Sequence, residues 1–197
     1  MNIIKPNLKW ARPLAPFRLN EIDGIAIHHS EHVSADIAEI HRWHLDKGWA
    51  GVGYHYFVDK KGNVYEGRGM NFGAHTADHN SHLFGICFQG DYHGKDRNMP
   101  VLQFEAGVQL IHWLKAQVPT IKTVRGHMHW RPTACPGQFF PLAKMMSYAN
   151  ETDADRIAKA LVSRGVTQDQ SYWADAMKGK LQPKPEYLMA IFDRLLR

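Results

Sequence analysis

The segment GHMHWRPTACPG, residues 126–137, brings two histidines and a cysteine together in one short stretch. Imidazole and thiolate are common ligands of Zn²⁺, and a catalytic zinc site typically has three protein ligands and one open position. His127 and Cys135 can supply two of them, and a third can come from His28 or His29 at the end of an apolar run. Spacing alone leaves open the alternative that these are surface or hydrogen-bonded core histidines.

The elements that must position these residues show in the apolar pattern of the first 150 residues. Short apolar runs bounded by polar residues or glycine predict buried strands, and a Lys-Lys-Gly-Asn turn between two alternating segments predicts a β-hairpin. FGICFQG is apolar almost throughout, which is typical of a central strand. The segments with strand character are 24–30, the hairpin of 53–67, 84–90 and 121–127.

Segments with helical spacing lie between or after these strands. Ser34 can cap a helix that runs to about Lys47 and ends at Gly48. A longer helix is predicted over 100–118, and a short one over 140–148. Strands that alternate with helices predict an α/β fold, in which a mixed central β-sheet is flanked by helices.

The distribution of histidine divides the chain. All 13 histidines lie between His28 and His129, and residues 150–197 contain none. Those last residues combine short helical segments with turn signals, so we place a domain boundary next to residue 149. We predict a catalytic domain over 1–149 and a small helical C-terminal extension over 150–197.

Composition limits the class of protein. The 197 residues are 44% hydrophobic and 22% charged, as in ordinary globular proteins. Two cysteines are too few for a disulfide framework, so free thiols or metal ligation are expected. The net charge of +5 suits an anionic partner, either nucleic acid or a wall polymer, but no Lys/Arg run of nucleic-acid type occurs. No apolar run reaches the length of a membrane span, and residues 1–16 lack the apolar core of a signal peptide.

Several segments follow one another in the order found in a known family. Over about residues 22–146 the chain resembles the zinc-dependent N-acetylmuramoyl-L-alanine amidases of phage endolysins and the related peptidoglycan recognition proteins. Several motifs in one order are far more specific than any one of them. The segments are IHHS, WHLDKGWAGVGYHYFVDKKGNVYEGRG, GAHTADHN, GICFQG and GHMHWRPTACPG.

The resemblance implies a metal site and a reaction. The family's zinc ligands correspond to His28, His127 and Cys135, so the implied cofactor is Zn²⁺. The implied substrate is bacterial peptidoglycan, cleaved at the amide bond between the lactyl group of N-acetylmuramic acid and L-alanine. A metal suits this hydrolysis because it polarises the carbonyl oxygen and lowers the pKa of a bound water.

The resemblance also implies catalytic side chains. Tyr54 matches a family tyrosine beside the metal, where a phenol can hydrogen-bond the attacking water or the oxyanion; the alternative is a packed strand aromatic. Thr133 stands where some phage-type amidases have a lysine. His129 stands where many relatives have aspartate and can relay protons, or it is an exposed loop histidine. Cys87 stands at about the position of a family glutamate, so the general base is not identified.

Two regions are expected to contact the wall. GAHTADHN matches a family groove segment, which implies substrate contacts for His75, Thr76 and Asn80; the alternative is a polar loop. Residues 150–197 are expected to form a small wall-binding module. A helical extension packed on the amidase is the alternative, because fewer than about 50 residues make a thin core.

The sequence therefore predicts an endolysin that lyses the cell wall. The alternative is a non-catalytic peptidoglycan-binding recognition module, which usually lacks the cysteine ligand, whereas Cys135 is present. We expect a monomer that is made in the cytoplasm without a signal peptide. We expect no membrane insertion and no nucleic-acid binding. The protein is expected to reach the wall through a holin or on lysis.

Overall fold

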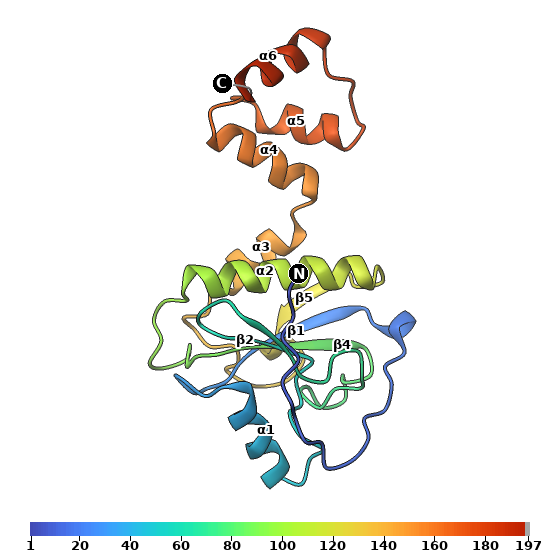
Figure 1. Ribbon diagram of the computed structural model, residues 1–197, viewed down its shortest axis with the longest axis vertical. Coiled ribbons are helices and arrows are strands. Elements are labelled where there is room, and N and C mark those ends of the chain that lie inside the picture. Colours follow the sequence, from blue (N-terminus) through green and yellow to red (C-terminus); the bar gives the residue numbers. More distant parts are fainter. Residues whose placement is uncertain (196–197) are drawn as a thin grey trace. The chain divides into compact units, whose positions relative to one another are not determined.

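A five-stranded sheet organises the larger part of the chain. The computed structural model describes residues 1–195, which divide into a unit of Met1–Ala149 and a second unit that begins at Asn150. In the first unit the strand order is β3-β2-β4-β1-β5 (Figure 1). Strand β1 is parallel to β4 and β5, β4 is parallel to β2, and β3 is antiparallel to β2, so the predicted mixed sheet is confirmed. The strands are β1 (Gly24–His29), β2 (Tyr56–Val58), β3 (Val64–Glu66), β4 (Leu83–Phe88) and β5 (Thr123–Gly126).

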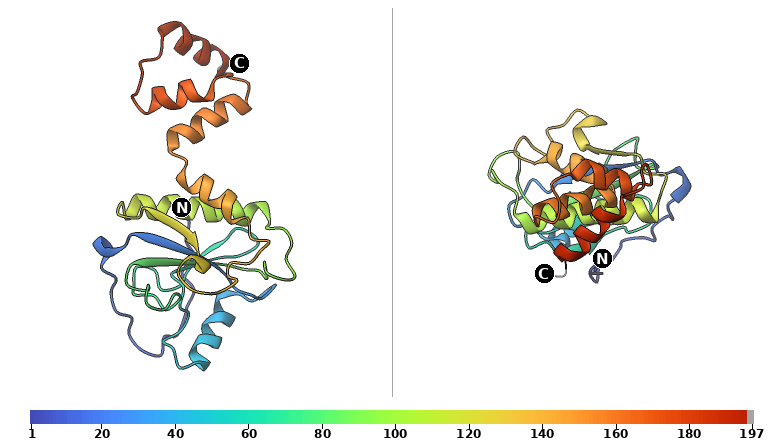
Figure 2. Two further views of the ribbon diagram at one scale, coloured as in Figure 1. Left: turned by 180° about the vertical axis from the view of Figure 1, so that it is seen from behind. Right: turned by 90° about the horizontal axis from the view of Figure 1, so that it is seen from above.

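Helices cover both faces of this sheet. Helix α1 (Ile37–Asp46) lies on one face, and α2 (Val101–Gln117) and α3 (Leu142–Asn150) lie on the other (Figures 1 and 2). Ile25 and Ile27 belong to the core cluster shared with α2. Because side chains alternate along a strand, Ala26 and His28 point toward the α1 face.

The start of α1 differs from the prediction. Ser34 is not the cap: Asp36 is, and its side chain accepts the backbone N–H of Glu39 at 2.8 Å. The Glu39 carboxylate accepts the backbone N–H of Asp36 in return, at 3.1 Å. This reciprocal pair satisfies two otherwise unpaired helix donors, which Ser34 cannot match because Ile37 stands three residues after it.

The N-terminal segment closes the outer edge of the sheet. The backbone N–H of Ile4 donates to the carbonyl of Val64, and the carbonyl of Ile4 accepts the N–H of Glu66, both at 2.8 Å. These bonds form a short parallel bridge beside β3. Backbone groups on the free side of β3 are thereby paired.

The second unit has a small core of its own. Its helices are α4 (Asp153–Ser163), α5 (Gln170–Met177) and α6 (Pro185–Leu195). Trp173 of α5 packs against Ala158, Val166 and Ile191. Within residues 1–195, no helix of either unit combines the length and the apolar character that a bilayer crossing requires.

Candidate metal centre

Two neighbouring strands bring His28 and His127 together. Strand β1 ends at His29, and β5 leads directly into a 3₁₀ turn, η2 (His127–His129). Because β1 and β5 are parallel neighbours, their carboxyl ends meet at one edge of the sheet, where binding sites of α/β folds commonly form. The ring centroids of His28 and His127 are 4.4 Å apart.

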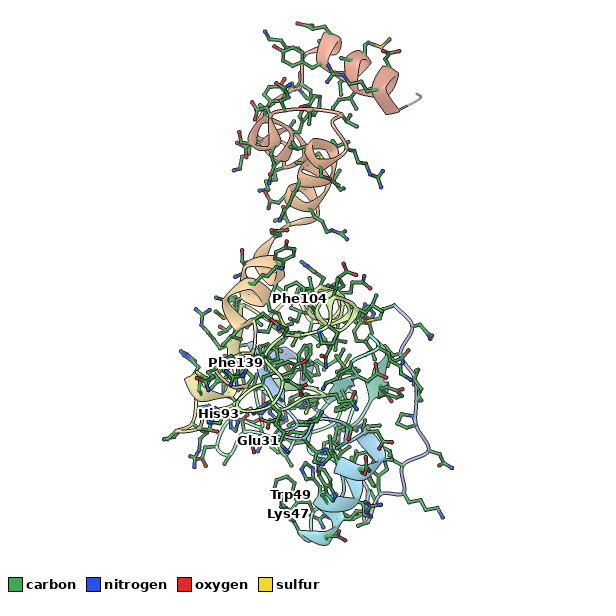
Figure 3. The ribbon with its side chains drawn as sticks, turned by 90° about the vertical axis from the view of Figure 1, so that its left-hand side faces the viewer. Glu31, Lys47, Trp49, His93, Phe104 and Phe139 are labelled. Atoms are coloured by element: carbon green, nitrogen blue, oxygen red, sulfur yellow. The ribbon has the colours of Figure 1, made fainter. Side chains whose placement is uncertain are left out.

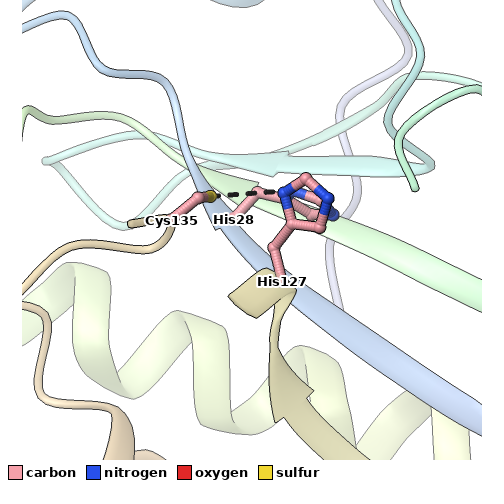
Figure 4. A group of neighbouring side chains, drawn as sticks. All are labelled: His28, His127 and Cys135. Atoms are coloured by element: carbon pink, nitrogen blue, oxygen red, sulfur yellow. Dashed lines mark hydrogen bonds between the residues drawn. The ribbon is translucent and has the colours of Figure 1, made fainter. Parts of the chain in front are cut away.

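The loop after η2 adds a thiol to these imidazoles. Sγ of Cys135 lies 3.7 Å from Nδ1 of His28 (Figure 4). One ligand-type atom from each of His28, His127 and Cys135 lies within 4.8 Å of the other two. The loop is held by the backbone bond from Met128 N–H to the carbonyl of Cys135, at 3.0 Å. The structure therefore brings together the three residues that the resemblance implied as ligands.

Burial favours the neutral form of all three side chains, which suits the two imidazoles as metal ligands but not the thiol. Burial is the first cause that lowers the pKa of His28 well below its ordinary value, and it also lowers the pKa of His127. Both rings are thus neutral near pH 7, and each has a nitrogen lone pair. Burial raises the pKa of Cys135 to about 12, so the sulfur needs a neighbouring cation to become a thiolate.

Tyr54 lies beside the cluster. Its ring centroid is 5.1 Å from that of His28. Burial raises the pKa of Tyr54 well above its ordinary value, with further contributions from the Cys87 and Cys135 thiols. The phenol therefore keeps its proton and can donate a hydrogen bond.

Cys87 occupies the strand position next to His28. It stands opposite His28 in the β1–β4 register, is fully buried, and is not joined to Cys135. Burial raises the pKa of Cys87 well above its ordinary value. This position therefore holds a neutral thiol, which does not act as a base near pH 7.

The other two catalytic candidates contact neighbours within their own loop. His129 is exposed, and its ring lies against Trp130 with centroids 5.1 Å apart. Thr133 is exposed, and its hydroxyl oxygen accepts the backbone N–H of Cys135 at 3.3 Å. Their catalytic roles stay predictions.

The predicted substrate-binding segment makes interior contacts. Nδ1 of His75 lies 3.1 Å from Nε2 of His28, and the Thr76 hydroxyl lies 3.5 Å from the same atom. The Asn80 side-chain oxygen accepts the backbone N–H groups of His75 and Thr76, at 2.8 and 2.9 Å. Substrate contact stays a prediction, and the contact between His28 and His75 had no sequence signal because 47 residues separate them.

Sequence reasoning also missed Glu31, which follows the β1 strand end (Figure 3). Its φ of 52° is uncommon for a residue other than glycine. Its carboxylate lies 3.8 Å from Nε2 of the buried His29. The charge of Glu31 adds to the burial that raises the pKa values of Cys135 and Tyr54, so it is an acidic group whose field reaches the centre.

Comparison with known proteins agrees with this geometry. The family model described as N-acetylmuramoyl-L-alanine amidase matches residues 18–138, which include all three ligand candidates. The chain belongs to the N-acetylmuramoyl-L-alanine amidase family. It is 30% identical over 124 residues to the endolysin of Enterobacteria phage K11, covering 61% of this chain and 80% of that protein.

Other relatives come from animals and bacteria. Peptidoglycan-recognition protein SC2 of Drosophila melanogaster is 34% identical over 103 residues, which cover 51% of this chain and 56% of that protein. The chain thus spans just over half the length of that relative. The solved structure of N-acetylmuramoyl-L-alanine amidase LysC from Clostridium intestinale superposes with a TM-score of 0.70 and 27% identity, covering 77% of this chain and 99% of LysC.

Proposed function

We propose that the chain hydrolyses the amide bond between the lactyl group of N-acetylmuramic acid and L-alanine in bacterial peptidoglycan. The observation that carries this proposal is the cluster of His28, His127 and Cys135, whose ligand-type atoms lie within 4.8 Å of one another. Membership of the amidase family supports the reaction, and the likeness to phage endolysins supports wall lysis as its purpose.

The donor set fits Zn²⁺. Typical Zn–N and Zn–S bonds and a tetrahedral angle place a ligating nitrogen and sulfur about 3.6 Å apart. Nδ1 of His28 and Sγ of Cys135 lie 3.7 Å apart. Two neutral imidazoles and one thiol leave a fourth position for water or substrate, which is the pattern of catalytic rather than structural zinc.

The chain's own residues would act around this ion. When bound, zinc would polarise the scissile carbonyl and make a bound water more acidic. Tyr54 would donate a hydrogen bond from its phenolic hydroxyl to the developing oxyanion. The neutral Cys87 thiol contributes no base, and Thr133 brings a hydroxyl where a lysine would bring charge. Tyr54 would therefore carry a larger share of oxyanion stabilisation.

A non-catalytic recognition module is the competing function. Purified peptidoglycan incubated with the full chain separates the two. We expect one zinc per chain by atomic absorption and release of stem peptides that begin with L-alanine. New reducing sugar ends without free amino ends would indicate a glycosidase, and binding without any cleavage would indicate a recognition module.

We also propose that the second unit binds the wall. A pocket of about 730 Å³ in this unit includes the rings of Tyr172, Trp173 and Tyr187 and the cations Lys184 and Arg194. Aromatic faces suit sugar rings, and the cations suit the carboxylates of stem peptides. Tyr187 is 44% exposed, so Tyr187→Ala should weaken co-sedimentation of the full chain with purified walls without unfolding it.

The route to the substrate follows from this function. We propose a monomer that acts on the wall after release through a holin or on lysis, with peptidoglycan rather than nucleic acid as its partner. Lysis that occurs only when the cytoplasmic membrane is permeabilised would support this route. Lysis by the chain alone from inside intact cells would contradict it.

A further inference from the structure

His75, in the loop formed by residues 73–80, lies within hydrogen-bonding distance of the second ring nitrogen of His28. Nδ1 of His28 faces Sγ of Cys135 at 3.7 Å, and Nε2 faces Nδ1 of His75 at 3.1 Å. The other nitrogen of His75, Nε2, lies 3.1 Å from the backbone carbonyl oxygen of Leu83. These contacts form a chain of hydrogen-bonding groups from the start of β4 to the metal centre.

The carbonyl at the end of this chain determines which nitrogen of His75 carries the proton. A carbonyl oxygen only accepts, so neutral His75 carries its proton on Nε2 and presents a lone pair at Nδ1. Two donors can reach that lone pair, the Thr76 hydroxyl at 2.9 Å and Nε2 of His28 at 3.1 Å. Donation by His28 from Nε2 leaves its own lone pair on Nδ1. That nitrogen is the one that faces Cys135.

The surroundings of His75 are shaped to hold its ring. A Cβ atom at Gly85 would lie 2.5 Å from Cγ of His75, and one at Gly73 would lie 2.8 Å from its Cδ2. Both distances are far below van der Waals contact, so only glycine leaves room for the imidazole. Asn80 fixes the backbone of the same loop by accepting the N–H groups of His75 and Thr76.

We propose that His75 is a positioning residue that holds His28 in the tautomer able to bind a metal through Nδ1. This inference rests on the proposed zinc site and gives GAHTADHN a task other than contact with the stem peptide. Partners of this kind typically set metal affinity, and their loss costs about 10-fold to 100-fold.

Two substitutions of His75 distinguish the role of Nδ1 as a hydrogen-bond acceptor from the other contacts of the ring. Asn places its side-chain oxygen near the position of Nδ1, so His75→Asn keeps an acceptor for His28. Gln places its amide nitrogen near the position of Nε2, so His75→Gln keeps the donor to Leu83 and offers no acceptor at the Nδ1 position. Zinc affinity of the purified full chain is measured by competition with a chromophoric chelator.

We expect His75→Gln and His75→Ala to weaken zinc binding by about 10-fold to 100-fold, and His75→Asn to stay within a few fold of the wild type. His41→Ala is the matched control. It removes another buried imidazole, one that accepts the N–H of Val52 and packs on Trp10, and it should leave zinc affinity unchanged. Equal affinity in the wild type and all three His75 variants would overturn the proposal.

The tautomer itself gives a second readout that needs neither metal nor substrate. Long-range ¹⁵N–¹H NMR spectra of the metal-free wild type should show His28 protonated on Nε2, and His75→Ala should populate both tautomers. A proton on Nδ1 of His28 in the wild type would overturn the proposal. If the wild type bound no zinc, the proposed function would fail, while the NMR spectra would still decide the role of His75.

Discussion

Sγ of Cys135 and Nδ1 of His28 lie 3.7 Å apart, although 107 positions separate the two residues in the chain. We expect Cys135→Ser to lose both zinc and amidase activity, because a hydroxyl is a much poorer zinc ligand than a thiolate at neutral pH. Zinc per chain by atomic absorption and release of stem peptides measure the two losses. Cys87→Ser is the matched control and should retain its zinc. A fully active Cys135→Ser variant would rule out the proposed site.

Tyr54→Phe should separate chemistry from packing. The variant keeps the ring beside His28 and removes only the phenolic donor. We expect turnover to fall by about 10-fold to 1000-fold at unchanged zinc content and melting temperature, as for the loss of one preorganised oxyanion donor. Tyr65→Phe is the control, since its hydroxyl bonds the carboxylate of Asp59 at 3.2 Å. Wild-type turnover in Tyr54→Phe would shift attention to His129.

Buried histidines should make the metal-free protein sensitive to acid. Burial lowers the pKa of His44 to about 4 and that of His75 to about 3. The unfolded chain binds these protons near pH 6.5 and the folded chain does not. The free energy of unfolding therefore has its full value above about pH 6.5. It decreases as pH falls toward 4 and then 3, at about 1.4 kcal/mol per pH unit for each fully titrating group.

Urea unfolding of the metal-free chain between pH 7.5 and pH 4.5 checks this dependence. His44→Gln removes one of the buried histidines, so its free energy of unfolding should fall less steeply over the same interval. The comparison between the two proteins cancels the carboxylates that titrate in both. Parallel curves for the wild type and His44→Gln would contradict the assignment.

The separate cores of the two units predict that residues 1–149 fold alone. Within residues 1–195, the core cluster around Trp173 is made of residues from the second unit. We expect the 1–149 fragment to retain its turnover on soluble muramyl peptides and to co-sediment less with intact walls. Equal co-sedimentation of the fragment and the full chain would remove the second unit from wall binding.

Local patterns predicted the elements of this fold better than their contacts. The apolar runs of β1 and β4, the Lys-Lys-Gly-Asn hairpin and the long α2 helix depend on short-range periodicity, and all are confirmed. The start of α1 was wrong because Ser34 and Asp36 are both good caps, and only a reciprocal partner at Glu39 decides between them.

For the site as well, some features could be predicted from the sequence and others could not. The three ligand candidates followed from a resemblance, and the spacing of the histidines alone left other roles open. The contact between His28 and His75 joins strand β1 to the 73–80 loop, and Gly85 of β4 leaves room for the His75 ring. Such an arrangement depends on strand order, which no local pattern carries.

The bridge between Ile4 and β3 has a consequence for how the molecule behaves at high concentration. An uncovered sheet edge offers a row of free donors and acceptors to the edge of another molecule, and growth from edge to edge leads to aggregates. With the backbone of Ile4 bonded to Val64 and Glu66, that row is already taken. A chain without its first five residues would expose these donors and acceptors. We therefore expect it to aggregate on storage faster than the full chain.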